Sequence, residues 1–208
     1  MKTLQHITYF PNIAHMALLF QKAHPCFEVW DNYTKQTYRN RAYIYGANGK
    51  QQLNIPVIHS QKNRQLYRDV KIANETDWQS QHLKSLQSAY RTSPFYEFYE
   101  DDLMPLFEGN FKYLMDFNFA CLDALIDCLD EPTQFETSEA YQADLLRIED
   151  HRSLVNCKKE ILQHFEPYTQ VFTEKHGFIS NLSLLDLLFN EGPNSFMYLE
   201  RQRVLNSA

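Results

Sequence analysis

Long apolar runs are missing from this chain of 208 residues. No stretch of about 18 consecutive apolar residues occurs, so we expect no membrane-spanning helix. The N-terminal residues also lack the apolar core of a secretory signal peptide, because Pro11 interrupts the first apolar segment. Both absences disfavour insertion into a membrane or secretion, and we expect a cytoplasmic protein.

Cysteine is scarce, with four residues at Cys26, Cys121, Cys128 and Cys157. Cys121 and Cys128 lie about two helical turns apart, which is too far for a disulfide bond. None of the four forms the closely spaced pair that zinc sites use. We therefore expect reduced thiols, no metal site and no cofactor.

Basic residues do not dominate either. The chain has 20 lysine and arginine residues against 26 aspartate and glutamate residues, which gives a formal net charge of −6. Proteins that bind nucleic acid usually carry a basic excess or a basic stripe, so we expect no nucleic-acid partner. The expected partner is a small molecule, and the sequence leaves the oligomeric state open.

The residues that are abundant are typical of a packed globule. The chain is 44% hydrophobic and 14% aromatic, which excludes general disorder. Its length suits a single domain over residues 1–208. Residues 133–166 are polar and include a charged segment, so we expect a mobile loop there.

The start of the chain predicts a βαβ unit. Residues 5–10 contain β-forming side chains, and Asn12 suits the N-cap of a helix over residues 13–23. A proline then ends this helix, and residues 27–30 predict a second strand. This order favours an α/β fold with a small mixed sheet, although α+β remains an alternative.

Further elements are predicted after this unit. Asn48-Gly49 lies between two strand-like segments and indicates a β-hairpin. Apolar periodicity predicts a helical middle and a C-terminal helix that pack on the sheet. The expected segments are a strand at 70–72, helices at 77–91, 111–130 and 181–193, and a final strand at 196–199.

The stretch "ITYFPNIAHMALLF" places Asn12 and His15 at a predicted strand-to-helix corner. Nucleotidyl-transfer enzymes hold phosphate at such a corner with two histidines, because a helix N-terminus attracts anions. This chain has one histidine there and no distal basic loop. The structural alternative, a corner with a half-exposed histidine, is therefore favoured over a phosphate site.

Asn40 and Arg41 are stronger candidates for substrate binding. The planar guanidinium group suits a carboxylate or a phosphate, and Tyr38 and Tyr43 flank the pair. The alternative is an arginine that pins the hairpin to an acidic helix end. In a parallel sheet, ligands bind at the carboxyl ends of the strands, so we expect these two residues to meet Asn12 and His15 there.

The helix over residues 77–91 carries Trp78 and His82 four positions apart, with Tyr90 further along. A tryptophan beside a histidine suits sugar stacking and proton transfer, although a core tryptophan with a hydrogen-bonded histidine is the favoured alternative. The candidate catalytic residues are His15 and His82. The candidate substrate-binding residues are Asn12, Asn40, Arg41, Trp78, Tyr90, Tyr168, Gln170 and Asp186.

Five blocks of sequence resemble the WbqC-like family, in its shorter form from Bacteroidetes-type bacteria. They are "YFPNI", "KQTYRNRAYIYGANGKQQLNIPV", "WQSQHLKSLQSAYRTSPFYEFYEDDLMPLFE", "YTQVF" and "NLSLLDLLFNEGP". The resemblance extends over about residues 7–199. Longer members have a glycine-rich segment where this chain has residues 133–166, which contain no glycine.

The resemblance implies a role in the synthesis of O-antigen and related bacterial surface polysaccharides. It implies a group-transfer enzyme that acts on a nucleotide-activated amino sugar, of acyl, aminoacyl or nucleotidyl type. A non-catalytic binding or scaffold protein of the same pathway is the alternative, and it predicts an exposed aromatic surface at Tyr96, Phe98 and Tyr99. The sequence does not specify the donor or the acceptor, or whether this short form is active.

Overall fold

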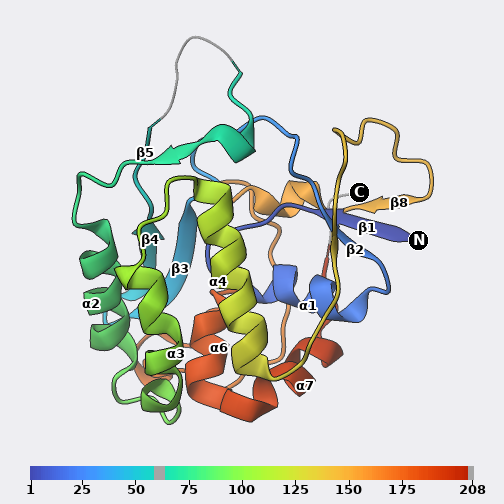
Figure 1. The fold of residues 1–208 in the computed structure, drawn as a ribbon. Coiled ribbons are helices and arrows are strands. Elements are labelled where there is room, and N and C mark those ends of the chain that lie inside the picture. Colours follow the sequence, from blue (N-terminus) through green and yellow to red (C-terminus); the bar gives the residue numbers. More distant parts are fainter. Residues whose placement is uncertain (59–63, 206–208) are drawn as a thin grey trace.

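The structure is a computed structural model that describes residues 1–58 and 64–205 (Figure 1). Its parallel sheet has the strand order β7-β2-β1-β8. These strands are β1 (Lys2–Gln5), β2 (Pro25–Phe27), β7 (Glu136–Thr137) and β8 (Ile148–Asp150). Helix α1 (Ile13–Gln21) connects β1 to its parallel neighbour β2, which confirms the predicted βαβ unit and the α/β fold class.

The first strand lies closer to the N-terminus than we predicted. β1 ends at Gln5, so a strand over residues 5–10 is wrong. After Gln5 the chain bends: Phe10 has a φ angle of 36°, and the Tyr9 N–H donates to the carbonyl of Tyr38. The β-forming residues of this stretch are buried in the core without pairing in the sheet, which explains their composition.

The predicted β-hairpin is confirmed. β3 (Arg41–Gly46) pairs antiparallel with β4 (Gly49–Asn54), and Gly46 lies opposite Gly49. Ala47 and Asn48 connect them, and Gly49 has a φ angle of 99°, a conformation that glycine adopts without strain. A second small antiparallel pair joins β5 (Val57–Ile58) to β6 (Lys71–Ile72), which matches the strand expected near residues 70–72.

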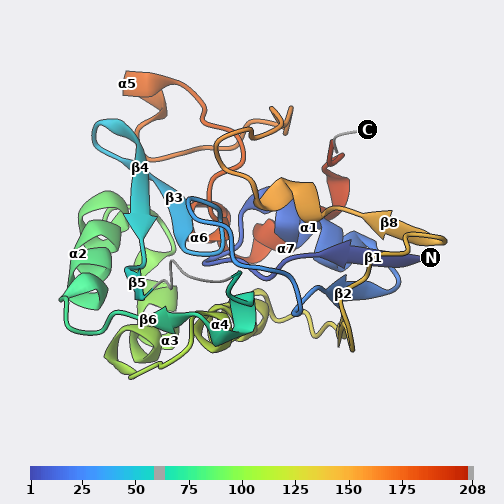
Figure 2. The same ribbon diagram turned by 90° about the horizontal axis from the view of Figure 1, so that it is seen from above.

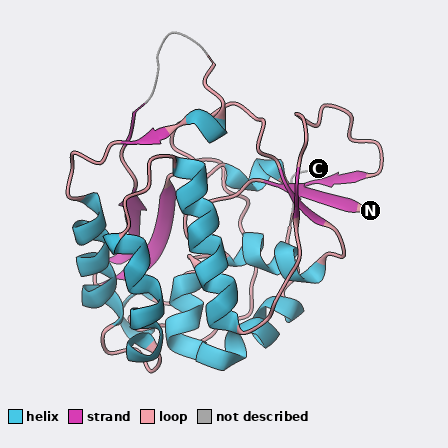
Figure 3. Ribbon diagram, in the orientation of Figure 1, coloured by secondary structure: helices cyan, strands magenta, loops and turns pink. Residues whose placement is uncertain are grey.

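Helices fill the space beside the hairpin and below the parallel sheet (Figure 3). The predicted helices of the middle and of the C-terminal region are confirmed, within a few residues at each end. The helices after α1 are α2 (Trp78–Tyr90), α3 (Tyr96–Glu108), α4 (Leu114–Leu129), α5 (Thr173–His176), α6 (Leu184–Glu191) and α7 (Ser195–Arg201). None of the helices in the described part of the chain is long and apolar enough to cross a membrane.

Helix α7 corrects the prediction of a final strand at residues 196–199. A 3₁₀ turn at Gly192–Asn194 leads directly into this helix, and Leu199 is fully buried. The side chain of Gln21 donates to the carbonyls of Leu199 and Gln202, which fastens α7 to the end of α1. A short apolar run does not distinguish a strand from a helical turn, so the sequence pattern was ambiguous here.

Residues 133–166 extend the parallel sheet on both sides (Figure 2). They contribute β7 at one edge and β8 at the other, followed by the 3₁₀ turn η2 (Arg152–Val155). Ser138 and His151 of this segment are buried despite its polar composition. The predicted mobility of the segment stays a prediction, but its strands place polar side chains at the ends of β1 and β2.

Candidate functional site

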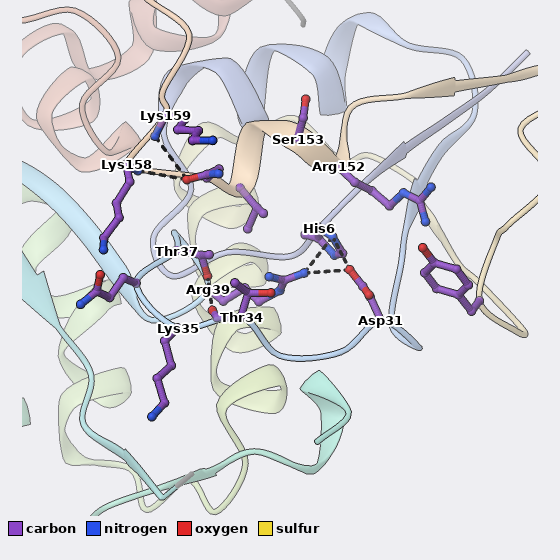
Figure 4. Close-up of a pocket in the computed structure, with 14 residues that line it drawn as sticks. His6, Asp31, Thr34, Lys35, Thr37, Arg39, Arg152, Ser153, Lys158 and Lys159 are labelled. Carbon is purple, nitrogen blue, oxygen red and sulfur yellow. Dashed lines mark hydrogen bonds and ion pairs between the residues drawn. The ribbon is translucent and has the colours of Figure 1, made fainter. Parts of the chain in front are cut away.

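A pocket of about 500 Å³ lies at the carboxyl ends of β1, β2 and β8 (Figure 4). β1 is flanked by β2 on one side and by β8 on the other, so the chain leaves β1 in one direction and returns on the opposite side. In parallel α/β sheets, ligands bind at such a switch point. The lining residues are His6, Asp31, Thr34, Lys35, Gln36, Thr37, Arg39, Tyr141, Arg152, Ser153, Val155, Asn156, Lys158 and Lys159.

The topology explains why these side chains meet. His6 directly follows β1, Asp31 lies in the loop after β2, and Arg152 follows β8. Arg39 comes from the segment that leads into the hairpin. Because parallel strands end at the same edge, the residues that follow them lie side by side even when they are distant in sequence.

A buried polar triad forms the floor of the pocket. Nη2 of Arg39 lies 2.9 Å from Nε2 of His6 and 3.1 Å from Oδ2 of Asp31. The Arg39 side chain is only 2% exposed, and its Cζ atom lies 5.2 Å from the centre of the Tyr67 ring. Nε of Arg39 has no hydrogen-bond partner among residues 1–58 and 64–205. The floor therefore holds a fixed guanidinium group with unused donor capacity.

His6 is neutral at physiological pH. Burial and the positive charge of Arg39 lower its pKa from 6.5 to about 4. Since an Arg39 N–H points at Nε2, this nitrogen is the acceptor, and the ring proton is on Nδ1, which lies 3.4 Å from the carbonyl of Glu28. A neutral ring places no second positive charge beside Arg39.

Asp31 is ionised and holds Arg39 in place. Burial alone would raise the pKa of Asp31, but the charge of Arg39 and the N–H of Asn32 favour the carboxylate, and the pKa of Asp31 is lowered. The side chain keeps 26% of its surface exposed. Asp31 therefore neutralises the one cation that is fully buried at the floor.

The rim is strongly basic. Lys35, Lys158 and Lys159 line the pocket from two different loops, and none of them has an ion-pair partner in the described part of the chain. The backbone N–H groups of Lys158 and Lys159 donate to Oδ1 of Asn156, which fixes the shape of their loop. Three free ammonium groups around one pocket create a site for an anion with more than one charge.

Arg152 lies on the opposite side of the pocket from Lys158 (Figure 4), and Tyr141 also lines the pocket. Arg152 makes a two-point contact with Asp150, from Nε to Oδ1 at 2.9 Å and from Nη2 to Oδ2 at 2.9 Å. Its Cζ atom lies 5.2 Å from the centre of the Tyr141 ring, which is 53% exposed. This end offers an aromatic face beside a guanidinium plane, a surface suited to a planar ring.

The residues predicted at the first strand-to-helix corner lie outside the pocket, and the N–H groups at this corner already have hydrogen-bond partners. The four leading N–H groups of α1 donate within the protein: Ile13 to the Leu182 carbonyl, Ala14 to Oδ1 of Asn181, His15 to Oδ1 of Asn12, and the next residue to the Asn12 carbonyl. These groups are not free to hold an anion.

His15 itself is 3% exposed, and burial lowers its pKa to about 3. Its Nδ1 lies 2.7 Å from Oδ1 of Asn12, whereas its Nε2 has no hydrogen-bond partner in the described structure. His15 and Asn12 do not line the pocket. The catalytic role predicted for His15 stays a prediction.

Asn40 and Arg41 also lie outside the pocket. Nδ2 of Asn40 donates to Oδ1 of Asn54 and to the carbonyl of Ile55, so Asn40 ties the start of β3 to the end of β4. Nε of Arg41 is buried without a hydrogen-bond partner among the described residues. Arg39, two positions before Arg41, lines the pocket instead, together with Arg152.

Trp78 and His82 are core residues of α2, with exposures of 4% and 6%. Nε2 of His82 accepts the N–H of Asn54 at 3.2 Å, so the ring proton is on Nδ1, which lies 2.9 Å from the hydroxyl of Tyr9. Burial lowers the pKa of His82 to about 4. Both ring nitrogens thus have hydrogen-bond partners, as expected for the structural alternative, and the catalytic role of His82 stays a prediction.

Four other predicted residues are brought together, around one buried carboxylate. Asp186 is fully buried; the hydroxyls of Tyr90 and Tyr168 donate to its two oxygens at 2.7 and 2.6 Å, and Nε2 of Gln170 donates at 2.8 Å. Burial raises the pKa of Asp186, and these three donors oppose the increase. The cluster joins α2, α6 and the segment before α5, away from the basic pocket.

None of the site residues predicted from the sequence lines the pocket. His6 was placed inside a strand and Asp31 in a loop of no assigned role, because the predicted strands ended too late: β2 spans Pro25–Phe27 and not residues 27–30. A signal was present after the short strand β2, which is followed by Glu28 and Asp31. The edge strand β8 gave no such signal, because "IED" has no β-strand composition.

No group of three or more histidine, cysteine, aspartate or glutamate side chains suited to a metal ion occurs within the described ranges. No curated protein and no solved structure matches the chain. Residues 8–165, more than half of the chain, match the WbqC-like protein family; the blocks around Tyr168 and Asp186 lie outside the match. The chain therefore belongs to the WbqC-like protein family.

Proposed function

We propose that this protein binds a nucleotide-activated amino sugar in the pocket at the ends of β1, β2 and β8. We further propose that it transfers an acyl or aminoacyl group to that sugar during the synthesis of bacterial surface polysaccharide. The observation that carries the proposal is the set of three unpaired lysines around the pocket, Lys35, Lys158 and Lys159. A diphosphate is the common anion that matches several free cations at one site.

The remaining parts of the pocket support a nucleotide over a simple phosphate. The ring of Tyr141 is half exposed beside Arg152, and a nucleobase can stack on such a surface. The volume of about 500 Å³ lies within the usual range of ligand pockets, roughly 300–1,000 Å³. The position at the switch point of a parallel sheet is where α/β enzymes bind nucleotides.

The transfer step requires a second substrate, an activated acyl donor such as a thioester. The amine nitrogen of the sugar attacks the carbonyl carbon of the donor and forms an amide bond. The bond from that carbon to the donor's sulfur breaks, the sulfur leaves as a thiolate, and the proton lost by the amine is passed to this thiolate, directly or through solvent. In this scheme the nucleotide part of the sugar stays intact and serves as the binding handle for the lysines.

Isothermal titration calorimetry with a panel of UDP-, GDP-, dTDP- and CMP-sugars tests the binding. The variant Lys158→Gln/Lys159→Gln removes two charge-assisted contacts, each about 1.5–3 kcal/mol, so we expect an affinity loss of at least tenfold. The matched control Lys71→Gln/Lys84→Gln removes the same charge from exposed positions outside the pocket and should bind like the wild type. Absence of binding across the panel, or equal loss in both variants, contradicts the proposal.

Mass spectrometry of reactions with an amino-sugar nucleotide and acyl donors then tests the transfer. Binding without any acylated product would favour the alternative, a non-catalytic binding protein. The aromatic surface expected for that alternative is not formed, because Tyr96 and Tyr99 are 2% and 3% exposed and only Phe98 faces solvent. For this reason the enzyme is the function that we propose.

A further inference from the structure

A second cavity, of about 880 Å³, lies between the end of α2, the end of α6, helix α7 and the segment that precedes α5. It is larger than the basic pocket and shares no lining residue with it. Most of its walls come from residues after 165, beyond the part of the chain that matches the family. The cavity is therefore built largely by a part of the chain to which the family match gives no role.

This second cavity, called the groove from here on, has acidic walls, whereas the walls of the basic pocket carry lysine and arginine side chains. None of its described lining residues is lysine, arginine or histidine. Two carboxylates, Glu174 and Glu191, line it without an ion-pair partner in the described chain. Hydroxyl groups of Thr92 and Thr169 lie at the exposed rim. The groove thus offers acceptors and hydroxyls to a ligand that carries donors and a positive charge.

The floor of the groove is rigid because Asp186 holds it from behind. Tyr168 and Gln170 line the groove, and both donate to Oδ2 of Asp186, at 2.6 and 2.8 Å. The ring of Tyr198 meets that of Tyr168 edge to face, with centroids 5.2 Å apart, and its hydroxyl donates to the carbonyl of Glu166. Side chains fixed in this way bind a ligand without losing much conformational freedom.

We propose that this groove binds a carbohydrate that carries a free ammonium group, that is, an unacylated amino sugar or a short oligosaccharide that contains one. The apolar C–H face of the sugar ring lies against Tyr198, its hydroxyls bond to Thr92 and Thr169, and its ammonium group pairs with Glu174 or Glu191. A neutral glycan uses only part of this set, and a nucleotide is repelled by the two carboxylates. The proposal is independent of the nucleotide-sugar function of the basic pocket.

The test uses saturation-transfer NMR and calorimetry on the full chain with chitosan oligosaccharides of two to four units. We expect binding by the free-amine oligosaccharides and at least tenfold weaker binding by the fully N-acetylated ones. The variant Glu174→Gln/Glu191→Gln should lose at least tenfold in affinity for the free-amine ligand. The variant Glu75→Gln/Glu108→Gln, with the same change at exposed glutamates outside the groove, should bind like the wild type.

Any result that differs from these expectations overturns the proposal. Equal affinity for acetylated and free-amine oligosaccharides shows that the carboxylates do not recognise an ammonium group. Binding of spermidine as tightly as of the oligosaccharide shows a general cation site with no selectivity for sugars. Equal loss in the two glutamate variants shows a long-range charge effect. Circular dichroism and thermal unfolding confirm that the variants remain folded, and intact nucleotide-sugar binding distinguishes failure here from failure of the basic pocket.

Discussion

Arg39 and Asp31 form an ion pair, with Nη2 of Arg39 3.1 Å from Oδ2 of Asp31, at the floor of a basic pocket. The arginine side chain is almost fully buried, whereas the carboxylate keeps a quarter of its surface exposed. Burial lowers the pKa of Arg39, so its charge is maintained by the partners around it. The pair thus links the loop after β2 to the segment before β3 and positions the guanidinium beneath the site.

Replacement of Asp31 by asparagine should destabilise the protein by about 2–4 kcal/mol, because it leaves the Arg39 guanidinium buried without a counter-charge. Urea unfolding at pH 7 measures the change. Asp69→Asn is the matched control, since Asp69 is exposed and has no ion pair in the described structure, and it should change stability by less than about 0.5 kcal/mol. Similar stability of the two variants would show that Arg39 does not depend on Asp31.

Three buried histidines, His6, His15 and His82, predict a loss of stability in mild acid. Their pKa values are lowered from 6.5 to about 4, 3 and 4, chiefly by burial. Between about pH 6.5 and 4 the unfolded chain binds protons that the folded chain does not, so stability falls as the pH falls through this window. Each histidine contributes up to about 1.4 kcal/mol per pH unit.

Chemical denaturation at pH 7.5, 6.5, 5.5 and 4.5 measures this slope. His82→Gln should flatten it, because protonation of His82 would place a hydrogen on Nε2 against the N–H of Asn54. His164→Gln replaces an exposed histidine and should leave the slope unchanged. If stability is constant from pH 7.5 to 4.5, the three rings are not held in the neutral form.

Elements of the fold were predictable from the sequence where several local signals indicate the same element. The N-cap at Asn12, the apolar periodicity after it and the proline that follows define α1, and the glycine at position 49 marks the hairpin. The strands at the edges were not predictable, because β7 and β8 have two and three residues and exist through pairing with distant partners. Pairing of this kind has no local sequence signature.

The candidate site was less predictable than the fold. Its residues come from four separate segments, and only the sheet order places His6 beside Arg152. The expectation that a ligand binds at the strand ends stays a prediction, and it depends on where each strand ends; β1 ends five residues before the predicted boundary. In contrast, Tyr168 and Asp186 were selected from separate blocks and meet at 2.6 Å, although in a buried cluster.

Asn181 closes the N-terminus of a helix that lies 167 positions away in the sequence. Its Oδ1 accepts the N–H of Ala14 at 2.9 Å, and its φ angle of 56° suits asparagine or glycine. We expect Asn181→Gly to cost about 1–2 kcal/mol through the lost cap, and Asn181→Ala to cost about 1 kcal/mol more through backbone strain. Thermal unfolding of both variants measures the difference; an alanine variant as stable as the glycine variant would show that the left-handed conformation is not kept.

Tyr168→Phe should destabilise the protein by an amount that depends on pH. Loss of one donor leaves the buried carboxylate of Asp186 with two donors, which costs about 1–3 kcal/mol while it is ionised. The same loss raises the pKa of Asp186 further, so near pH 5 a larger fraction of Asp186 takes up a proton in the folded state and needs the donor less. The cost should therefore be larger at pH 7.5 than at pH 5.

Tyr45→Phe provides the comparison, because the Tyr45 hydroxyl donates to the carbonyls of Gly177 and Phe172, which do not titrate. The loss of unfolding free energy caused by Tyr45→Phe should be the same at pH 7.5 and pH 5, because the histidines change the stability of the wild type and of the variant equally. If the cost of Tyr168→Phe were equally constant, Asp186 would keep one protonation state from pH 7.5 to pH 5. The pH dependence of this one substitution thus decides whether burial or hydrogen bonding controls the carboxylate behind the groove.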